Sequence, residues 1–402
     1  MGALQSSPTF PFFRFKLTPS LAEIEAEDSW ARPTESAPKM KVDMLRVSVV
    51  GAGSISREFA LHHFNAANFT EVVSIVDLNL ERAKALATDV GSVLAGAHLD
   101  TGTTAYAAGV QGGARGTPVA HSAALGEGID GCDVVYIGTT PGSHKTLALE
   151  ALAAGKHVLL EKPLAATAED ADAIMAAAAE AADRGLFVGL DIGMRWNPAL
   201  HELRRLAVTE QALGPLTAGR LTMHYAQWPR KWQVQPWVAE RAQGGPLREV
   251  GTHFFFGILQ CFGPRSVARV RANVDFPADD PAAAETTASG TLELRSGLRI
   301  DLDMRTDVAG SDRYELEIVG EQGALQLENF AQLRRTAPVR EWLVEEGSYG
   351  RAESVTTLVD AVKSRPTAGP GMVTARDGRD AQTVLDPVLG SGGEWVELEY
   401  FC

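Results

Sequence analysis

The sequence lacks long hydrophobic runs and an excess of basic residues, and each absence excludes a class of protein. No uncharged apolar stretch reaches the roughly 18 residues that a membrane-spanning helix needs, which predicts a soluble chain without a membrane partner. The 51 acidic residues outnumber the 37 lysines and arginines, and the formal net charge is -14. Because such a chain repels a phosphate backbone, nucleic acid is not an expected partner.

Cysteine is scarce as well, with three residues in a chain of 402. They are odd in number and widely spaced, at Cys132, Cys261 and Cys402. This pattern supports neither a disulfide framework nor a zinc site. We therefore expect no bound metal and a reducing compartment, which favours a cytoplasmic location.

The first 44 residues differ in composition from the rest of the chain. They are rich in Pro and Ser and show no sustained hydrophobic period, which predicts a disordered N-terminal extension over 1–44. Residues 1–22 contain no acid, so an organelle-targeting peptide stays open as an alternative, although no Arg-rich amphipathic helix is evident.

From residue 45 onward the sequence alternates between patterns typical of strands and patterns typical of helices, which indicates βαβ units and a parallel sheet. Strands are expected over 46–53, 71–79, 133–140, 157–163 and 186–192, with helices between them. A glycine-rich stretch, 91–116, is interpreted as an inserted loop, followed by a strand at 117–121 and a helix at 122–128. These elements predict an N-terminal Rossmann domain over 45–197.

After residue 197 the hydrophobic period changes to two, which is typical of strands with one solvated face. Such strands are expected over 267–275, 287–297, 298–306 and 313–323. We predict an α/β protein whose second domain, 198–402, is α+β with an open, mainly antiparallel sheet. Helices expected over 353–391 could pack back on the first domain.

The first expected strand ends in a pair of glycines that opens a helix. Gly51 would permit a tight turn, and Gly53 would let the backbone approach a pyrophosphate. The amides of Ser54 and Ile55 would then face the phosphates at the helix N-terminus. In this strand-turn-helix context the pattern predicts a dinucleotide-binding site.

Two further residues refine that prediction. Ser56 stands where a third glycine is usual, and it is small enough for close packing of helix on strand. Asp77 closes the next strand, 24 residues beyond Gly53. A carboxylate there can accept hydrogen bonds from the adenosine ribose and would repel a 2′-phosphate, so NAD is favoured and NADP stays possible.

Two more strand ends carry residues suited to a cofactor pocket, because ligands of open α/β sheets bind at the carboxyl ends of the strands. The expected cofactor contacts there are Thr139, Thr140, Pro141, His144, Glu161 and Lys162. Pro163 restricts Lys162 to an extended conformation and would fix its ammonium beside the nicotinamide. Such a cation could hold a substrate oxygen, although a lone strand-end lysine is more often a surface residue.

Several motifs in a fixed order extend the pattern. The glycine turn, TTPGSH (139–144), EKPLA (161–165), RWNP (195–198) and GGPLREVGTHFFFGILQCFG (244–263) together resemble the glucose-fructose oxidoreductase, inositol dehydrogenase and rhizopine-catabolism (Gfo/Idh/MocA) superfamily. The resemblance covers nearly all of the chain beyond residue 44. It implies a Rossmann domain, a sheet domain often used for homo-oligomers, and NAD(P)-dependent oxidation or reduction of secondary alcohols in sugars, cyclic polyols and related small molecules.

The resemblance also implies catalytic residues. Lys162 matches the motif lysine, His253 matches the histidine of an Asp-x-Gly-x-His pattern, and Glu249 stands at the aspartate position. On a helix over 247–262, Glu249 and His253 lie at i and i+4 on one face. His253 would then be the general base and Glu249 its support. Some members of the superfamily carry another acid at the position of Phe256, so a role that depends on that acid is not expected in this chain.

A segment rich in aromatic and basic residues, 225–237, could form a substrate wall or simply cover the sheet. Its candidate substrate contacts are Trp228 and Trp232, and it also contains Arg230. Arg195 and Asn197, at another strand end, are further candidates. These residues do not identify the substrate.

Two other functions are compatible with the same motifs. One is a glycosidase that uses tightly held NAD to oxidise, eliminate and re-reduce its substrate. The other is a non-catalytic regulator that senses a dinucleotide. The joint presence of Lys162 and His253 argues against the regulator, because a sensor needs no base beside a cation.

Overall fold

The computed structural model describes residues 44–65, 68–96, 104–107, 125–345, 350–364 and 371–400. The extension predicted over 1–44 lies outside these residues, apart from its last position. The strand predicted over 117–121 and the first three residues of the helix predicted over 122–128 also lie outside them, and a 3₁₀ turn forms over Gly126–Ile129.

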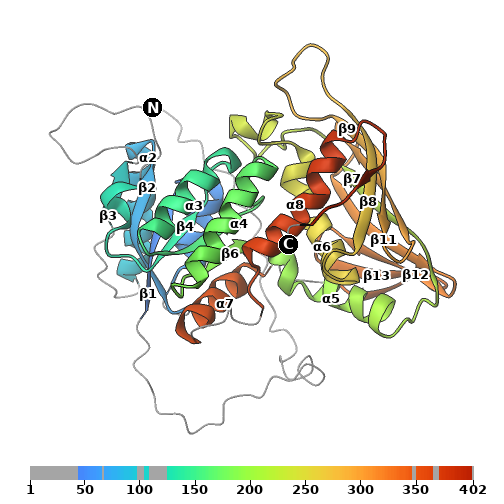
Figure 1. Cartoon of the computed structure of the whole chain (residues 1–402), viewed down its shortest axis with the longest axis horizontal. Coiled ribbons are helices and arrows are strands. Elements are labelled where there is room, and N and C mark those ends of the chain that lie inside the picture. The colour runs from blue at the N-terminus through green and yellow to red at the C-terminus, as the bar shows by residue number, and fades with distance from the viewer. Residues whose placement is uncertain are drawn as a thin grey trace, which may run out of the picture. The chain divides into compact units, whose positions relative to one another are not determined.

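A six-stranded parallel sheet forms the first layer of the fold (Figure 1), in the order β3-β2-β1-β4-β5-β6. This order reverses direction between β1 and β4, as in a Rossmann fold. The two central strands, β1 and β4, are almost wholly buried, as expected for a parallel sheet covered on both faces. The strands are β1 (Leu45–Val50), β2 (Thr70–Asp77), β3 (Thr104–Ala107), β4 (Val134–Ile137), β5 (His157–Glu161) and β6 (Val188–Asp191).

Helices connect these strands near the predicted places. They are α1 (Ser54–Glu58), which continues as a π-helical turn over Phe59–His63, α2 (Leu80–Gly96), α3 (His144–Ala153) and α4 (Ala168–Ala182). The α4 helix begins after Thr167, whose side chain caps it by accepting a hydrogen bond from the Asp170 backbone N–H.

The interpretation of 91–116 as a loop was wrong in part. The α2 helix continues to Gly96, and β3 pairs with the end of β2 at the sheet edge. The glycine content of this stretch obscured two short structured pieces. One completes a helix, and the other pairs with backbone groups of β2 that would otherwise be exposed.

A nine-stranded sheet forms the second part, in the order β14-β13-β12-β11-β7-β10-β9-β8-β15. Neighbouring strands are antiparallel except β7 and β10. The predicted fold class, a Rossmann sheet plus an open and mainly antiparallel sheet, is thus confirmed. The strands are β7 (Leu216–His224), β8 (Val267–Asp275), β9 (Thr287–Leu294), β10 (Arg299–Arg305), β11 (Arg313–Gly320), β12 (Gly323–Glu328), β13 (Gln332–Ala337), β14 (Glu341–Val344) and β15 (Val396–Glu397).

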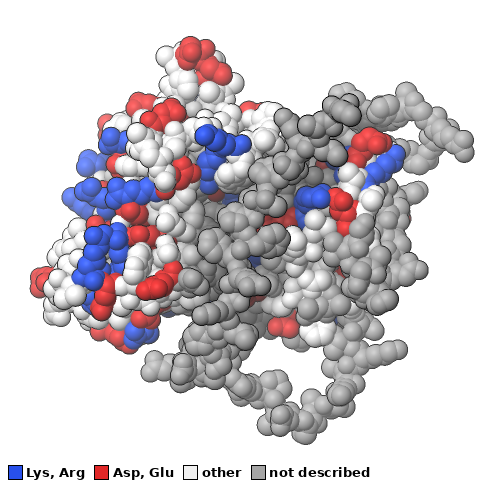
Figure 2. Space-filling view, turned by 180° about the vertical axis from the view of Figure 1, so that it is seen from behind, with Lys and Arg blue, Asp and Glu red and all other residues white. Residues whose placement is uncertain are grey.

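One face of this sheet packs against helices, whereas the other is charged. The helices are α5 (Pro198–Arg204), followed by a π-helical turn over Arg205–Thr209, α6 (Thr252–Phe262) and α8 (Ala375–Gly390). The strand β10 alternates buried and exposed residues, and exposed arginines form ion pairs along the open face, such as Arg299 with Glu293 at 2.9 Å. Figure 2 shows side chains of both signs interspersed on the described surface.

The C-terminal helices contact elements of the parallel sheet. The helix α7 (Arg351–Ser364) packs on β6, and its buried residues join the core formed by β1, β2 and β4. The helix α8 contacts α4 and β6 as well as α6 and β8, so it touches elements of both sheets (Figure 1). Among the described residues, no helix is both long and apolar enough to cross a membrane.

Candidate functional site

The glycine turn between β1 and α1 has two glycines in different situations. Gly51 has φ of 92°, and a Cβ there would lie 2.8 Å from the Gly138 carbonyl oxygen, so only glycine fits. Gly53 has ordinary backbone angles, and a Cβ would meet nothing within 4 Å. The space beside Gly53, at the start of α1, is therefore open to a ligand, and the exposed Ser54 and half-exposed Ile55 follow it.

The residues flanking this turn hold it in place. The Ser56 hydroxyl donates to the Gly138 carbonyl oxygen at 3.2 Å, so a small residue does permit close packing of α1 on β4. The Asp77 carboxylate accepts the Ala52 and Asn79 backbone N–H groups, each at 2.7 Å. Each carboxylate oxygen has a second lone pair, so Asp77 can still accept from a ribose hydroxyl.

The loop after β4 is anchored by a buried histidine. His144 is fully buried, with Nδ1 3.0 Å from the Pro163 carbonyl oxygen and Nε2 3.3 Å from that of Thr139. Burial lowers the pKa of His144 to about 4, so the ring is neutral and donates its single N–H to one of these carbonyls. The side chain thus connects the ends of β4 and β5. Pro141 is buried beside it, while Thr139 and Thr140 are half-exposed.

Glu161 lies beneath the site, not at its surface. Its carboxylate accepts the Tyr136 hydroxyl at 2.9 Å and is paired in register with Asp191 on β6. Burial and the neighbouring Asp191 raise the pKa of Glu161. Its Oε2 also accepts the Lys162 backbone N–H at 3.3 Å, so Glu161 holds the backbone that carries the lysine.

Lys162 reaches across to the second sheet's helical layer. Its Nζ donates to the Glu249 carbonyl oxygen at 3.1 Å and to Glu249 Oε1 at 3.3 Å. The two side chains are 14% and 12% exposed, so this ion pair is largely shielded from water. Glu249 Oε2 also accepts the Gln233 side-chain N–H at 3.4 Å.

His253 lies one helical turn beyond Glu249. Its ring meets Phe330 edge-on, with 5.7 Å between centroids. Burial, followed by the charges of Lys162, Arg351 and Arg230, holds the pKa of His253 well below its usual range. The structure therefore brings together an ammonium, a carboxylate and a neutral imidazole, which is a set able to bind a hydroxyl group and accept its proton.

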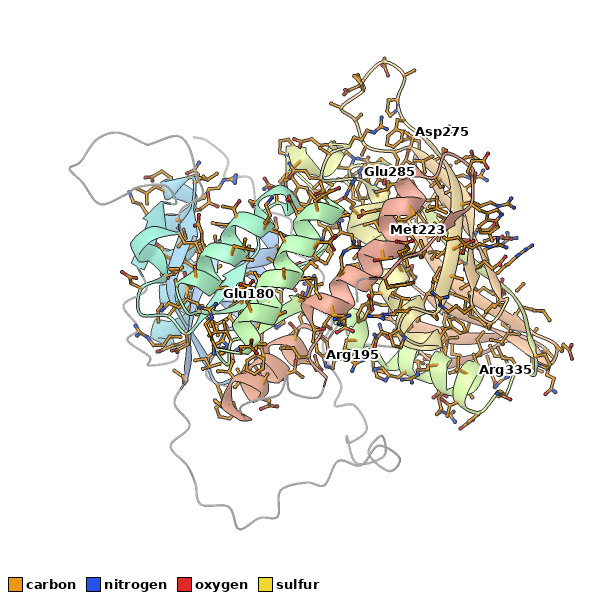
Figure 3. The ribbon with its side chains drawn as sticks, in the orientation of Figure 1. Glu180, Arg195, Met223, Asp275, Glu285 and Arg335 are labelled. Carbon is orange, nitrogen blue, oxygen red and sulfur yellow. The ribbon has the colours of Figure 1, made fainter. Side chains whose placement is uncertain are left out.

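The helix that carries Glu249 and His253 is preceded by two glycines, at 244 and 245, where the chain packs tightly. It starts as a π-helical turn over Leu247–Gly251 and continues as α6. The buried Glu285 (Figure 3) accepts the Leu247 backbone N–H at 2.8 Å. Gly245 has φ of 102°, and a Cβ there would overlap the Glu285 carboxylate. Sequence analysis missed Glu285, and the glycine pair 244–245 was its only signal.

The aromatic segment contributes an arginine that lies near two tryptophans. The Arg230 guanidinium carbon lies 5.4 Å from the Trp228 ring centroid and 4.6 Å from that of Trp232. Arg230 Nε donates to Gln233 Oε1 at 3.0 Å, and Nη1 donates to the Tyr314 hydroxyl at 3.3 Å. The charge of Arg230, which lies near Trp228 and Trp232, thus contributes to the lowered pKa of His253.

The other two predicted substrate contacts are engaged elsewhere. Asn197 is fully buried and caps α5, accepting the Ala199 N–H at 2.9 Å and the Leu200 N–H at 3.1 Å. Its amide nitrogen donates to the Phe330 carbonyl oxygen. Arg195 (Figure 3) donates to Gln260 on α6. Neither side chain has a recorded contact with Lys162, Glu249 or His253.

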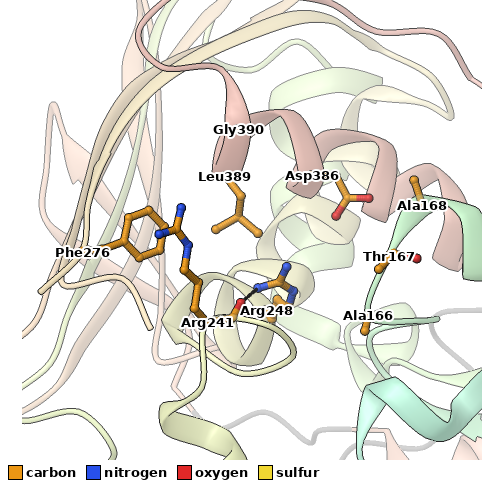
Figure 4. Close-up of a pocket in the computed structure, with 9 residues that line it drawn as sticks. All are labelled: Ala166, Thr167, Ala168, Arg241, Arg248, Phe276, Asp386, Leu389 and Gly390. Carbon is orange, nitrogen blue, oxygen red and sulfur yellow. Dashed lines mark hydrogen bonds between the residues drawn. The ribbon is translucent and has the colours of Figure 1, made fainter. Parts of the chain in front are cut away.

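A separate cavity of about 340 Å³ is lined by the start of α4, the end of α8, and Arg241, Arg248 and Phe276 (Figure 4). The Arg241 guanidinium carbon lies 3.6 Å from the Phe276 ring centroid, and Arg248 Nη1 donates to the Arg241 carbonyl oxygen at 2.9 Å. Asp386 faces them from α8. None of the residues lining this cavity belongs to the group around Lys162, so it is distinct from the candidate site.

Comparison with family models matches both parts of the fold. Residues 45–190 match a model described as "Oxidoreductase family, NAD-binding Rossmann fold", and residues 202–326 match the "GFO/IDH/MocA C-terminal domain". The chain belongs to the Gfo/Idh/MocA oxidoreductase family. The resemblance predicted from the motifs is confirmed, and the first part is an NAD-binding Rossmann domain.

Curated members of the Gfo/Idh/MocA family show what such chains can do. The 1,5-anhydro-D-fructose reductase of Ensifer adhaerens is 34% identical over 212 residues, 52% of this chain and 54% of that protein. The inositol 2-dehydrogenase of Acidiphilium cryptum is 24% identical over 358 residues, 82% of this chain and 91% of that protein. The chain thus spans about half the length of the first relative and most of the second.

Solved structures of the family share the fold. GenD2 from gentamicin A biosynthesis, in complex with NAD, aligns with a TM-score of 0.68 at 21% identity, covering 89% of this chain and 97% of that chain. The aldose-aldose oxidoreductase of Caulobacter crescentus aligns with a TM-score of 0.69 at 19% identity, covering 88% and 100%. At these identities the likeness establishes the architecture.

Proposed function

We propose that this chain is an NAD(P)-dependent dehydrogenase. It would transfer hydride between the nicotinamide and a secondary alcohol or carbonyl of a sugar, cyclic polyol or related small molecule. The contact of Lys162 with Glu249, beside His253, carries this proposal. This contact brings the end of β5, where the nicotinamide of a Rossmann domain is expected, next to the helix that carries the neutral base His253.

The fit of the cofactor is supported by the glycine turn. The open space at Gly53 leaves room for a pyrophosphate against the backbone, with the Ser54 and Ile55 amides as donors. Asp77 would accept the ribose hydroxyls, and its charge favours NAD over NADP. Further residues proposed to line or support the cofactor pocket are Gly51, Thr139, Thr140, Pro141, His144, Glu161 and Lys162.

The proton chemistry follows from the charges in the site. His253, with its lowered pKa, is neutral at physiological pH and can accept the substrate hydroxyl proton. The Lys162 ammonium would donate a hydrogen bond to the same oxygen and stabilise negative charge that develops there. Glu249 would hold the Lys162 side chain in place through their ion pair. The bound nicotinamide supplies the hydride acceptor.

The remaining candidates would shape the substrate pocket. Trp228 and Trp232 are proposed as its wall. Asn197 would act indirectly, because it holds Phe330, which packs on His253. Arg195 stays a candidate contact. We also propose that 45–197 serves as the cofactor-binding domain and 198–402 as the substrate-binding domain.

A homo-oligomer is part of the proposal. Its support is the open face of the nine-stranded sheet, which no described helix covers and which carries ion-paired side chains. An interface there would be polar and sensitive to salt. Sedimentation at low and high salt tests it, and a monomer under both conditions would contradict it.

The proposed activity is tested by absorbance at about 340 nm with NAD, and separately with NADP, across sugars, sugar acids and cyclic polyols. Lys162→Ala should abolish the signal. Arg184→Gln, at an exposed arginine after α4 whose side chain makes no hydrogen bond or ion pair within the described residues, should leave it unchanged. NADH formation that Lys162→Ala retains would refute the role given to Lys162, and cofactor binding without oxidation of any compound would refute the dehydrogenase.

A further inference from the structure

Arg230 is held rigidly in an orientation suited to a ligand. Its guanidinium carbon lies 5.4 Å from the Trp228 ring centroid and 4.6 Å from that of Trp232, within the range of a cation–π contact with each ring. Hydrogen bonds to Gln233 and Tyr314 hold two of its nitrogens. The third nitrogen, Nη2, donates to no protein acceptor within the described part of the chain, so its two N–H groups are available to a ligand.

The charge of Arg230 has no counterion in the described part of the chain. The carboxylate of Glu249 is reached only through Gln233, and it already pairs with Lys162. The carboxylate of Asp312 accepts the Tyr314 hydroxyl at 2.6 Å and the Ala226 N–H at 2.9 Å. A half-buried cation without an ion pair is unfavourable on its own, and a bound anion would compensate it.

The position of Arg230 ties it to the reacting groups. One chain of contacts runs from Arg230 through Gln233 and Glu249 to Lys162. The charge of Arg230 also contributes to the lowered pKa of His253. A small ligand with a hydroxyl group at Lys162 and His253 can therefore extend an acidic group towards Arg230.

We infer that the substrate of this chain is a hydroxylated compound that carries an anionic group, a carboxylate or a phosphate, which Arg230 binds through Nη2 of its guanidinium. The inference rests on the proposed dehydrogenase function, whose site it extends. Charge-assisted hydrogen bonds from a guanidinium suit both anions, and the hydrogen bonds that already hold Arg230 reduce the entropy lost on binding. The tryptophans thus serve to present a cation and not only to cover a sugar ring.

The test compares ligands that differ at one carbon, which carries a carboxylate or a phosphate ester in one ligand and a neutral hydroxymethyl group in the other. Matched pairs are D-gluconate with D-glucitol, D-glucuronate with D-glucose, and D-glucose 6-phosphate with D-glucose. Each is titrated by calorimetry into the full-length protein saturated with NADH, where an alcohol cannot be oxidised. We expect at least one anion to bind about 10- to 100-fold more tightly than its neutral partner. The carboxylate and phosphate pairs show which of the two groups the site prefers.

Variants of Arg230 identify the source of the preference. Arg230→Gln should remove it, and Arg230→Lys should retain part of it, because the charge remains without the planar fork. Arg184→Gln, at the exposed arginine after α4, is the matched control and should behave as wild type. Thermal unfolding of each variant shows that it is folded.

The outcomes separate this inference from the proposed function. If no anion in the panel binds more tightly than its neutral partner, or if the preference persists in Arg230→Gln, the inference is wrong. Oxidation of neutral substrates without any preference for anions would refute the inference and keep the dehydrogenase. A preference that depends on Arg230, without hydride transfer, would refute the dehydrogenase and leave an anion-binding site.

Discussion

Alanine at Gly53 separates a glycine that faces a ligand from one that the fold requires. Gly53 has φ of -78° and ψ of -178°, which alanine adopts freely, and its added methyl group would meet nothing within 4 Å. Gly51, two residues earlier, has φ of 92°, and its methyl group would meet the Gly138 carbonyl oxygen at 2.8 Å. The same substitution should therefore have opposite consequences at the two positions.

The magnitudes follow from these surroundings. Gly53→Ala should lower the free energy of unfolding by less than about 1 kcal/mol, the cost of a poorer N-cap. Its methyl group would occupy the space proposed for the pyrophosphate, so the Kd for NADH should rise at least about tenfold, or about 1.4 kcal/mol. Gly51→Ala should lower the free energy of unfolding by about 1–3 kcal/mol through backbone strain, and by more where the Gly138 carbonyl resists displacement.

Two measurements on each variant decide between these roles. Urea unfolding without cofactor gives the stability, and quenching of protein fluorescence by NADH gives the Kd. The reasoning would fail if Gly53→Ala bound NADH as tightly as wild type, because the pyrophosphate could not then lie against Gly53. A large loss of stability in Gly53→Ala would equally contradict the open space observed there.

Three other substitutions test the site. His253→Ala should lower kcat at least about 100-fold with an unchanged Kd for NADH. Because the pKa of His253 is lowered, the wild-type kcat should show no titration near pH 6.5. A midpoint at about 6.5 in the pH profile of kcat would contradict this. Gly245→Ala should lower the free energy of unfolding by at least about 2 kcal/mol in urea, since the methyl group displaces Glu285; wild-type stability would show that the packing is looser. His144, whose pKa falls from 6.5 to about 4 on folding, contributes stability that is complete above pH 6.5 and is lost towards pH 4. His144→Gln should therefore flatten the pH dependence of unfolding by about 3 kcal/mol between pH 7 and 4, and an unchanged slope would refute the buried neutral ring.

The parts of the site that sequence reasoning found are those encoded within a single element. The glycine turn and Asp77 have a spacing that one strand, one turn and one helix impose. Glu249 and His253 are related by a helical repeat, which the structure retains although the first turn is π-helical. Their approach to Lys162 could be anticipated only through the family resemblance, because the two segments are 87 residues apart.

Polar residues at strand ends were harder to interpret, because position along the strand does not reveal the direction of the side chain. His144, Glu161 and Asn197 were predicted as cofactor or substrate contacts. In the structure each engages groups of the fold itself: His144 reaches backbone carbonyls, Glu161 binds Tyr136, and Asn197 caps a helix. Their role as ligand contacts stays a prediction, and support of the residues that touch the ligand is the part that their geometry favours.

The same limit applied to short strands. The strands β12, β13 and β14 contain four to six residues each and include several charged side chains, so their period-two pattern is weak. They form because β11 offers an unpaired edge on which a meander can continue. Such pairing is a property of the neighbouring strand, and the segment's own sequence does not encode it.

The role of Glu285 was the hardest to predict from the neighbouring residues in the sequence. It lies in a loop beside alanines and threonines, where an acid is typically solvated, and its partner Leu247 is 38 residues away. The loop is drawn onto the segment before the π-helical turn by backbone hydrogen bonds, such as Ala284 N–H to the Ala239 carbonyl oxygen at 2.7 Å. Once the loop is held there, a carboxylate satisfies the first N–H of the helix that carries Glu249 and His253. The requirement for glycine at 245 then follows from the volume of that carboxylate. One buried acid, Glu285, thus explains a glycine that lies 40 residues earlier in the sequence.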